Sequence, residues 1–169
     1  MQWLHAQASV NSGIKQEDAF SIDKVNLYDR LGFDTFVKLS TNFYTRVFED
    51  DQTWFRTIFS NSTKEEAIRN QYEFCIQRMG GPPLYGQRRG QPSLIGRHSP
   101  YAMTKEAAGR WLYHMEAALD DTHEIDSDSK NRLFKFFKHT AFFLVAGKEL
   151  TNNHRLVGYG GCKHRVGEA

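Results

Sequence analysis

His98 is the residue of this chain whose type and setting best fit a chemical role. It lies in the stretch Arg97-His98-Ser99-Pro100, at the end of a segment, residues 80–100, that contains all four prolines of the protein. Histidine is the most common metal ligand in proteins and can also exchange a proton near neutral pH. The ordinary alternative is a histidine on the surface of a loop, so the neighbouring residues must decide between the two interpretations.

The neighbours of His98 include the residue types that a haem-binding histidine needs. Haem iron requires an axial ligand of fixed orientation, an apolar wall for the macrocycle and cations near the propionates. Leu94 and Ile95 could form the apolar wall, and guanidinium groups pair well with carboxylates. The candidate cations are Arg88, Arg89 and Arg97. These residues favour a haem site, although a basic surface loop would have the same composition.

Residues 80–100 must hold His98 in place without a continuous helix. Proline lacks a backbone donor and glycine destabilises a helix, so we expect a loop here. Apolar anchors at Leu84, Tyr85 and Leu94 indicate that this loop packs on the core. Long ordered loops are uncommon and are often functional, which supports the interpretation of this segment as a site loop.

Helical periodicity dominates the rest of the chain. Apolar residues recur at spacings of three and four in residues 33–48, 67–79, 107–119 and 133–145. Ser62 and Glu65 match a capping box for the second of these helices, and Thr104 can cap the third. No stretch alternates as a strand would, so we predict an all-α protein with one domain.

The two ends of the chain are expected to lie outside this helical core. Residues 1–25 show only weak helical periodicity, which predicts an N-terminal extension. From Lys148 onward the chain is polar, glycine-rich and mildly basic, which is typical of disorder. The predicted organisation is therefore an extension at 1–25, a core domain at 26–150 and a flexible tail at 151–169. Because neither end has a sustained apolar face, we expect neither to build the site.

Composition limits the classes of partner and location. The chain has 169 residues, of which 40% are hydrophobic, and this suits one domain with a full core. A formal net charge of +2 is too small to argue for nucleic acid or a membrane surface. The chain shows no secretory signal and no apolar run of membrane-spanning length. Cys75 and Cys162 make no disulfide framework. We expect a soluble, cytoplasmic monomer or homodimer.

Several stretches of the chain match one known family. Besides the Gly80-Gly81-Pro82-Pro83 run and the stretch around His98, the matching residues lie at 42–48, 54–55 with 58–59, 70–74, 78–85, 96–100, 111–112 and 139–147. On these motifs, over about residues 26–150, the chain resembles the truncated haemoglobins of the second group, in particular the plant (non-symbiotic haemoglobin-like) members. The resemblance implies a globin-like fold, truncated to a two-over-two helical sandwich around a haem.

The resemblance also implies a role for each residue on the iron-binding side. It makes His98 the ligand of the iron of a haem b, and it makes Arg97 and Tyr85 contacts of the haem propionates. It places Phe59 against the haem edge. The remaining haem contacts would be Leu94, Ile95 and Trp111.

On the opposite side, the resemblance implies a hydrogen-bonded ligand pocket. Tyr44 would be the distal tyrosine, with Gln71 and Trp111 as further donors to the ligand. Ala67 stands where ordinary globins have a distal histidine, and its methyl group cannot bond a ligand. Hydrogen bonding to the ligand would therefore depend on the other three residues. Core packing is the ordinary alternative for Tyr44 and Trp111, because both lie on apolar helical faces.

The function implied by the resemblance is reversible binding of O₂, CO and NO. Donors stabilise O₂, which gathers negative charge, over apolar CO, and several donors predict slow O₂ release. We therefore expect sensing, scavenging or redox roles rather than bulk transport. The alternative is an enzyme, an NO dioxygenase or peroxidase, dependent on an external reductase because the chain lacks a dinucleotide fingerprint. A third possibility is an all-α interaction domain without haem.

Overall fold

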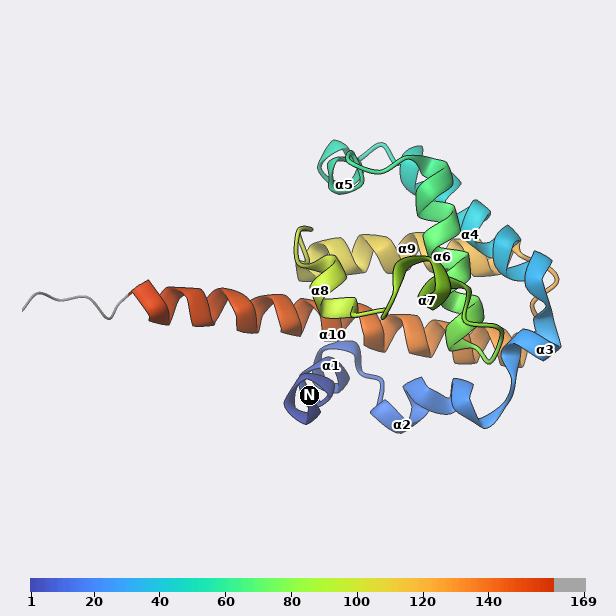
Figure 1. Cartoon of the computed structure of the whole chain (residues 1–169), viewed down its shortest axis with the longest axis horizontal. Helices are drawn as coiled ribbons and strands as arrows, with labels where there is room; N and C mark the ends of the chain where they lie inside the picture. Colours follow the sequence, from blue (N-terminus) through green and yellow to red (C-terminus); the bar gives the residue numbers. More distant parts are fainter. Residues whose placement is uncertain (160–169) are drawn as a thin grey trace, which may run out of the picture.

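The structure is a computed structural model that describes residues 1–159. All regular elements in this range are helices, with no β-strand among the described residues. Figure 1 shows the arrangement of the helices. The long elements are α4 (Phe33–Phe48), α6 (Lys64–Arg78), α9 (Lys105–Asp121) and α10 (Ser127–Tyr159). The short ones are α1 (Gln2–Ser12), α2 (Gln16–Ala19), η1 (Phe20–Lys24), α3 (Leu27–Leu31), α5 (Thr53–Ile58), α7 (Leu84–Arg89) and α8 (Leu94–His98). The predicted all-α class is confirmed.

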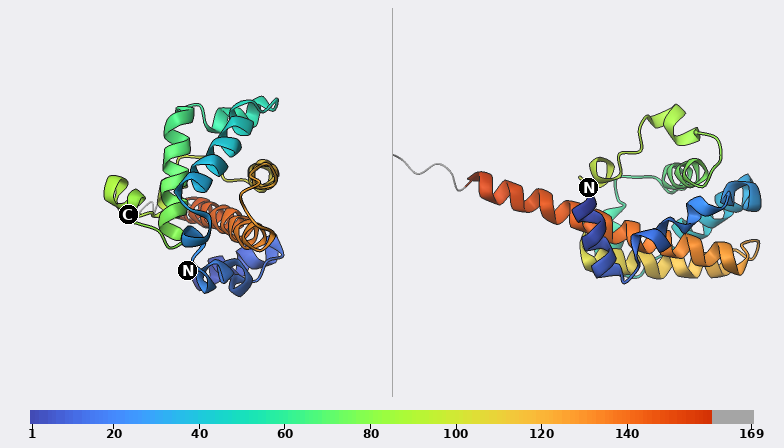
Figure 2. Two further views of the ribbon diagram at one scale, coloured as in Figure 1. Left: turned by 90° about the vertical axis from the view of Figure 1, so that its right-hand side faces the viewer. Right: turned by 90° about the horizontal axis from the view of Figure 1, so that it is seen from below.

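The four long helices form two packed pairs. α4 packs on α6, α9 packs on α10, and α4 also contacts α9, which joins the pairs (Figures 1 and 2). The apolar stripe of α4 buries Phe36, Leu39, Phe43 and Val47 at helical spacing. This arrangement is the expected two-over-two sandwich of a truncated globin.

Helix starts follow the capping residues closely. Thr104 caps α9 as predicted, because its hydroxyl oxygen accepts the Ala107 N–H at 3.0 Å. The cap of α6 lies one residue later than predicted. Its acceptor is Thr63 Oγ1, which bonds the Glu66 N–H at 3.1 Å. Both Ser62 and Thr63 can cap a helix, so the sequence alone did not distinguish between them.

The last helix continues beyond the predicted core boundary near residue 150. α10 reaches Tyr159, and its C-terminal part projects from the body of the protein (Figures 1 and 2). The rest of the predicted tail, with Cys162, lies outside the described residues. No helix in the described range is both long and apolar enough to span a membrane.

Residues 1–25 fold into α1, α2 and η1, and they pack on α10. Leu4 and Ala8 of α1 are buried in a small apolar cluster with Phe143 of α10. α1 also exposes large apolar side chains on another face, Trp3 at 53% and Val10 at 77%. Buried and exposed apolar residues are therefore mixed along α1, which explains why its periodicity is weak in the sequence.

The segment at 80–100 is more regular than predicted. It contains the two short helices α7 and α8, so the expectation of a loop without secondary structure is wrong. Proline is compatible with a helix start, and Pro83 directly precedes α7. Gly90, with φ of 76°, ends α7 in a left-handed conformation. Gly81 packs so closely on α3 and α6 that a Cβ there would lie 2.7 Å from Ile76 and Tyr28 side-chain atoms.

Candidate functional site

A cavity of about 280 Å³ lies among the long helices, with α5, α7 and α8 closing its sides. Its size is near the lower end of the range of about 300–1,000 Å³ for small-molecule sites. Most of its lining is apolar or aromatic, and all of the lining residues fall between Tyr44 and Leu144. The N-terminal helices therefore contribute nothing to the wall, as expected.

The fold brings nearly all of the predicted site residues to this one cavity. The predicted residues that line it are Tyr44, Phe59, Ala67, Gln71, Tyr85, Leu94, Arg97, His98 and Trp111. The exception is Ile95, which lies one residue after a lining position. Its side chain packs beside Gly147 of α10 and belongs to the apolar cluster that holds α1. Ile95 supports the helix that carries His98 rather than the cavity wall.

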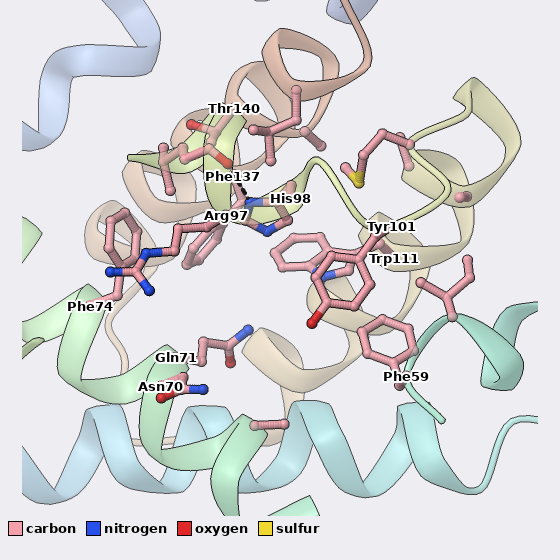
Figure 3. A pocket seen from close by; sticks show the side chains of 18 of the residues that line it. Phe59, Asn70, Gln71, Phe74, Arg97, His98, Tyr101, Trp111, Phe137 and Thr140 are labelled. Carbon is pink, nitrogen blue, oxygen red and sulfur yellow. Dashed lines mark hydrogen bonds between the residues drawn. The ribbon is translucent and has the colours of Figure 1, made fainter. Parts of the chain in front are cut away.

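His98 presents one ring nitrogen to the cavity. Its other nitrogen, Nδ1, lies 2.7 Å from the carbonyl oxygen of Leu94, one turn earlier in α8. A carbonyl can only accept, so Nδ1 carries the proton and Nε2 keeps a free lone pair. Burial lowers the pKa of His98, partly opposed by the bond to Leu94. Figure 3 shows the ring directed into the open space. A neutral imidazole of fixed tautomer is the form that binds a metal.

Gln71 lies across the open space from His98 (Figure 3). Its Oε1 atom is buried and has no hydrogen-bond partner among the described residues. A buried polar atom without a partner costs about 1–3 kcal/mol. The side-chain amide can be turned to present either its oxygen or its NH₂ group, and in both orientations one polar group needs a partner. A ligand in the cavity would supply that partner.

Tyr44 and Trp111 enter the same space from α4 and α9. Tyr44 packs edge-on against Phe59, with ring centroids 6.2 Å apart, and the Trp111 ring lies 4.7 Å from that of Phe43. Burial raises the pKa of Tyr44, and the nearby Cys75 thiol adds to the shift. The phenol therefore keeps its proton and can donate a hydrogen bond.

Two of the three candidate arginines remain candidates for binding an acidic group. Arg89 and Arg97 line the cavity, and each guanidinium lies 5.8 Å from the centre of the Tyr85 ring. Arg88 is engaged elsewhere. Its Nε donates to the Glu73 carboxylate at 2.6 Å, a bridge between α6 and α7 that lies away from the lining. Arg88 is therefore a structural residue in this fold.

The cavity also contains residues that the sequence did not single out. Tyr101 lies beside His98, with ring centroids 6.2 Å apart, and Figure 3 shows it facing the same space. No sequence signal marks Tyr101, because it follows a proline in an irregular segment. Phe137, Thr140 and Leu144 line the α10 side. Their helical spacing was visible in the sequence, but a core position has the same spacing.

These features fit the haem that the sequence suggested. The cavity has an aromatic wall, one neutral imidazole with a free nitrogen, and two guanidinium groups suited to propionates. Across from the imidazole, Gln71 supplies a polar group that lacks a partner. A flat, largely apolar molecule with two carboxylates and a metal at its centre would satisfy each of these features.

Known proteins share both the sequence and the helical arrangement of this chain. The profile of a family described as bacterial-like globin matches residues 26–143. The chain is 60% identical to two-on-two hemoglobin-3 of Arabidopsis thaliana, over 97% of this chain and 95% of the relative. It is 56% identical to group 2 truncated hemoglobin 3-1 of Lotus japonicus, over 91% and 92% of the two chains. Among solved structures, it is similar to a truncated oxygen-avid haemoglobin from Bacillus subtilis, with 33% identity and a TM-score of 0.62 over 69% and 96% of the two chains.

Proposed function

The chain belongs to the bacterial-like globin family, as a group II truncated haemoglobin of the plant type, and from this premise we propose that it binds haem b and, reversibly, O₂, CO and NO. The observation that carries the proposal is the pairing of His98 and Gln71 across one cavity. His98 offers a free Nε2, and Gln71 holds a buried polar atom without a partner in the described chain. The Bacillus subtilis protein of similar structure is named as oxygen-avid, which agrees with the choice of O₂.

His98 is the residue that would hold the cofactor. Its Nε2 would be the iron ligand, and the 2.7 Å contact of Nδ1 with Leu94 O fixes the ring and makes Nε2 more basic. When bound, the haem supplies an iron with one open coordination position for a diatomic ligand. The residues suited to the propionates are Arg89, Arg97 and Tyr85, because guanidinium and phenol groups donate to carboxylates.

The opposite side of the cavity determines which ligand is favoured. Tyr44 keeps its proton, and Trp111 and Gln71 add an indole N–H and an amide. Donors stabilise a ligand that gathers negative charge, such as O₂, more than they stabilise apolar CO. Each bond to a charged acceptor contributes about 1.5–3 kcal/mol, so several donors together slow the release of O₂. This property suits sensing, scavenging or redox chemistry better than bulk transport.

The test of this proposal is the absorption spectrum of the purified protein, reduced and then exposed to CO and to O₂. We expect an intense Soret band that shifts with each ligand, one haem per chain and slow O₂ release. A colourless protein that takes up no added haem would contradict the proposal. Such a result would leave the all-α interaction domain as the better explanation.

A further inference from the structure

A buried charged cluster lies where α5 meets α9. Its centre is Asp50, in the turn between α4 and α5, whose side chain is fully buried. Arg110 donates twice to this carboxylate, from Nε to Oδ2 at 2.8 Å and from a terminal nitrogen to Oδ1 at 2.9 Å. His114 Nε2 bonds Oδ2, and the backbone N–H of Gln52 donates to Oδ1 at 2.7 Å. The carboxylate thus uses all of the roughly four acceptor positions that it has.

The cluster is ionised at its centre. The hydrogen bonds from Arg110, supported by those from His114 and Gln52, hold the pKa of Asp50 far below its usual range against the opposing effect of burial. An ionised carboxylate only accepts, so His114 Nε2 carries the hydrogen of their bond. His114 Nδ1 is buried and has no partner in the described range, so Asp50 is the hydrogen-bond partner that holds this ring.

The cluster connects two walls of the cavity. On α9, Arg110 directly precedes the cavity residue Trp111, and His114 follows it by about one turn. On the α5 side, the Phe55 ring lies 5.6 Å from the His114 ring, and Phe55 itself lines the cavity. Ile58 and Phe59 line the cavity from the end of the same segment. One carboxylate therefore links the turn before α5 to the part of α9 that carries Trp111.

Few other polar contacts join α5 to the rest of the described chain. None of the closely packed helix pairs in the described chain includes α5. It lies at the outer edge of the molecule in Figure 1, and the side chain at its start, Gln52, makes no capping bond. The short polar contacts within α5, such as Thr57 Oγ1 to Thr53 O at 2.8 Å, do not reach another helix. The apolar side chains Phe55, Ile58 and Phe59 pack on the core, and the Asp50 cluster adds the polar contacts that join this segment to α9.

We propose that Asp50, Arg110 and His114 are positioning residues that fix the α5 wall against Trp111 and so control how fast a bound ligand leaves the cavity. The ligand part of this inference rests on the proposed function, whereas the tethering of α5 does not. Replacing the carboxylate by an amide removes the charge and leaves one acceptor oxygen in place of two, so some of the donors of Arg110 and His114 lose their acceptor. The α5 segment then opens more often, and a ligand held beside Phe59 and Trp111 escapes more readily.

The test compares Asp50→Asn with Asp51→Asn in the full chain. Asp51 is a matched control, because it is adjacent, its side chain is 83% exposed and it lies 3.4 Å from the same Arg110. Amide hydrogen exchange at 53–58 reports opening of α5, and the C–O stretching frequency of the CO complex reports the surroundings of the ligand. We expect Asp50→Asn to speed exchange at 53–58 by about 5- to 150-fold, to shift or split the C–O band and to speed CO release. Exchange in α6 should stay at the parental rate.

A second pair of variants separates positioning from a general loss of stability. Arg110→Lys keeps a charge but loses the two-point contact, and Arg110→Met loses both. We expect the C–O band of Arg110→Lys to lie between those of the parent and Arg110→Met. Parental exchange at 53–58 in both Asp50→Asn and Arg110→Met would overturn the tethering, and a parental C–O band in both would overturn the control of the ligand. If the parent bound no haem, the proposed function would fail, and the exchange data would still decide the tethering.

Discussion

The two sides of the cavity are built in different ways. His98 lies at the end of α8, a helix of five residues, none of which is fully buried. Tyr44, Gln71 and Trp111 lie on α4, α6 and α9, which are each at least 15 residues long and bury apolar faces in the main core. The side that would hold the cofactor is therefore supported by less buried helical structure than the opposite side.

This difference indicates what fixes each side. The positions of Tyr44 and Trp111 follow from packing of the long helices, which is set whether or not a ligand is present. The His98 side depends on a few local contacts: His98 to Leu94 O at 2.7 Å, Arg97 to Arg89 O, and Lys148 of α10 to Ser99 O. We therefore expect changes on the His98 side to alter haem retention, and changes on the other side to alter ligand kinetics while haem stays bound.

The largest effect is expected for His98→Ala. Changing groups that merely orient a metal ligand costs about 10- to 100-fold in affinity, so loss of the ligand itself should weaken haem binding at least this much. The measurement is transfer of haem to an acceptor protein, followed by the Soret band. Equal haem loss from the variant and the parent would contradict the assignment of His98.

His123→Ala is the suitable control for that experiment, because His123 is exposed and far from the cavity lining. His114 and His139 also lie in helices, but they are less suitable as controls. The structure places His114 in the Asp50 cluster and His139 against His5, so replacing either would disturb packing as well.

The next largest effect is expected on the opposite side, for Tyr44→Phe and Trp111→Phe. Each removes one donor, at a cost of about 1–3 kcal/mol, which corresponds to about 5- to 150-fold faster O₂ release. Haem content should not change. Stopped-flow displacement of O₂ by CO measures the rate, and Tyr113→Phe is the control because Tyr113 is exposed on α9. Parental release rates in both single variants and the double variant would refute the distal role of these residues.

The same contrast explains what the sequence could predict. The helical periods predicted the long helices that carry Tyr44, Gln71 and Trp111. That these three residues meet at one pocket was implied by the resemblance and not by the periods. The setting of His98 in residues 80–100 singled it out among seven histidines, and the resemblance to a family implied its role as iron ligand. The positions of residues in the irregular segments were harder to predict from the sequence. Tyr101 lay outside any pattern, and Ile95 was placed in the cavity wall although it packs toward α10. Arg88 could not be separated from Arg89, because the partners of Arg88, which are Glu73 and Asn70, come from α6.

A moderate effect is expected when the support of α7 is removed by Glu73→Gln. Glu73 is buried and accepts from Arg69 at 2.8 Å and from Arg88 at 2.6 Å, which ties α6 to the segment that leads to His98. Loss of this charge should cost about 1–3 kcal/mol of stability, with Tm falling by about 2–4 °C per kcal/mol. Calorimetry tests this change, with exposed Glu65→Gln as the control. An unchanged Tm with unchanged haem retention would show that Glu73 does not stabilise the segment that leads to His98.

The smallest effect on the haem site is expected from changes at the contact of α1 with α10, which lies outside both walls of the cavity. His5 Nδ1 lies 3.2 Å from His139 Nε2, and burial lowers the pKa of both residues. Detached α1 therefore binds protons more readily than docked α1, so docking is strongest above about pH 6.5 and weakens as the pH falls below it. Hydrogen exchange in α1 should rise by at most about tenfold per pH unit for each histidine.

The Soret band should stay constant over the same pH range, because α1 does not line the cavity. His139→Gln should flatten the pH dependence of exchange in α1. If haem were lost between pH 7 and pH 5.5 in step with faster hydrogen exchange in α1, the N-terminal helices would support the site. That result would contradict the expectation that α1 does not affect haem binding.

The His98 imidazole faces the cavity through Nε2, and we propose that it is the iron ligand of a bound haem. The most direct measurement is the ferrous absorption spectrum of His98→Gly, loaded with haem, with and without free imidazole. We predict that the spectrum differs from the parental one without imidazole and returns to it when imidazole occupies the space of the missing side chain. A parental spectrum in His98→Gly without imidazole would contradict the claim, because another group would then hold the iron.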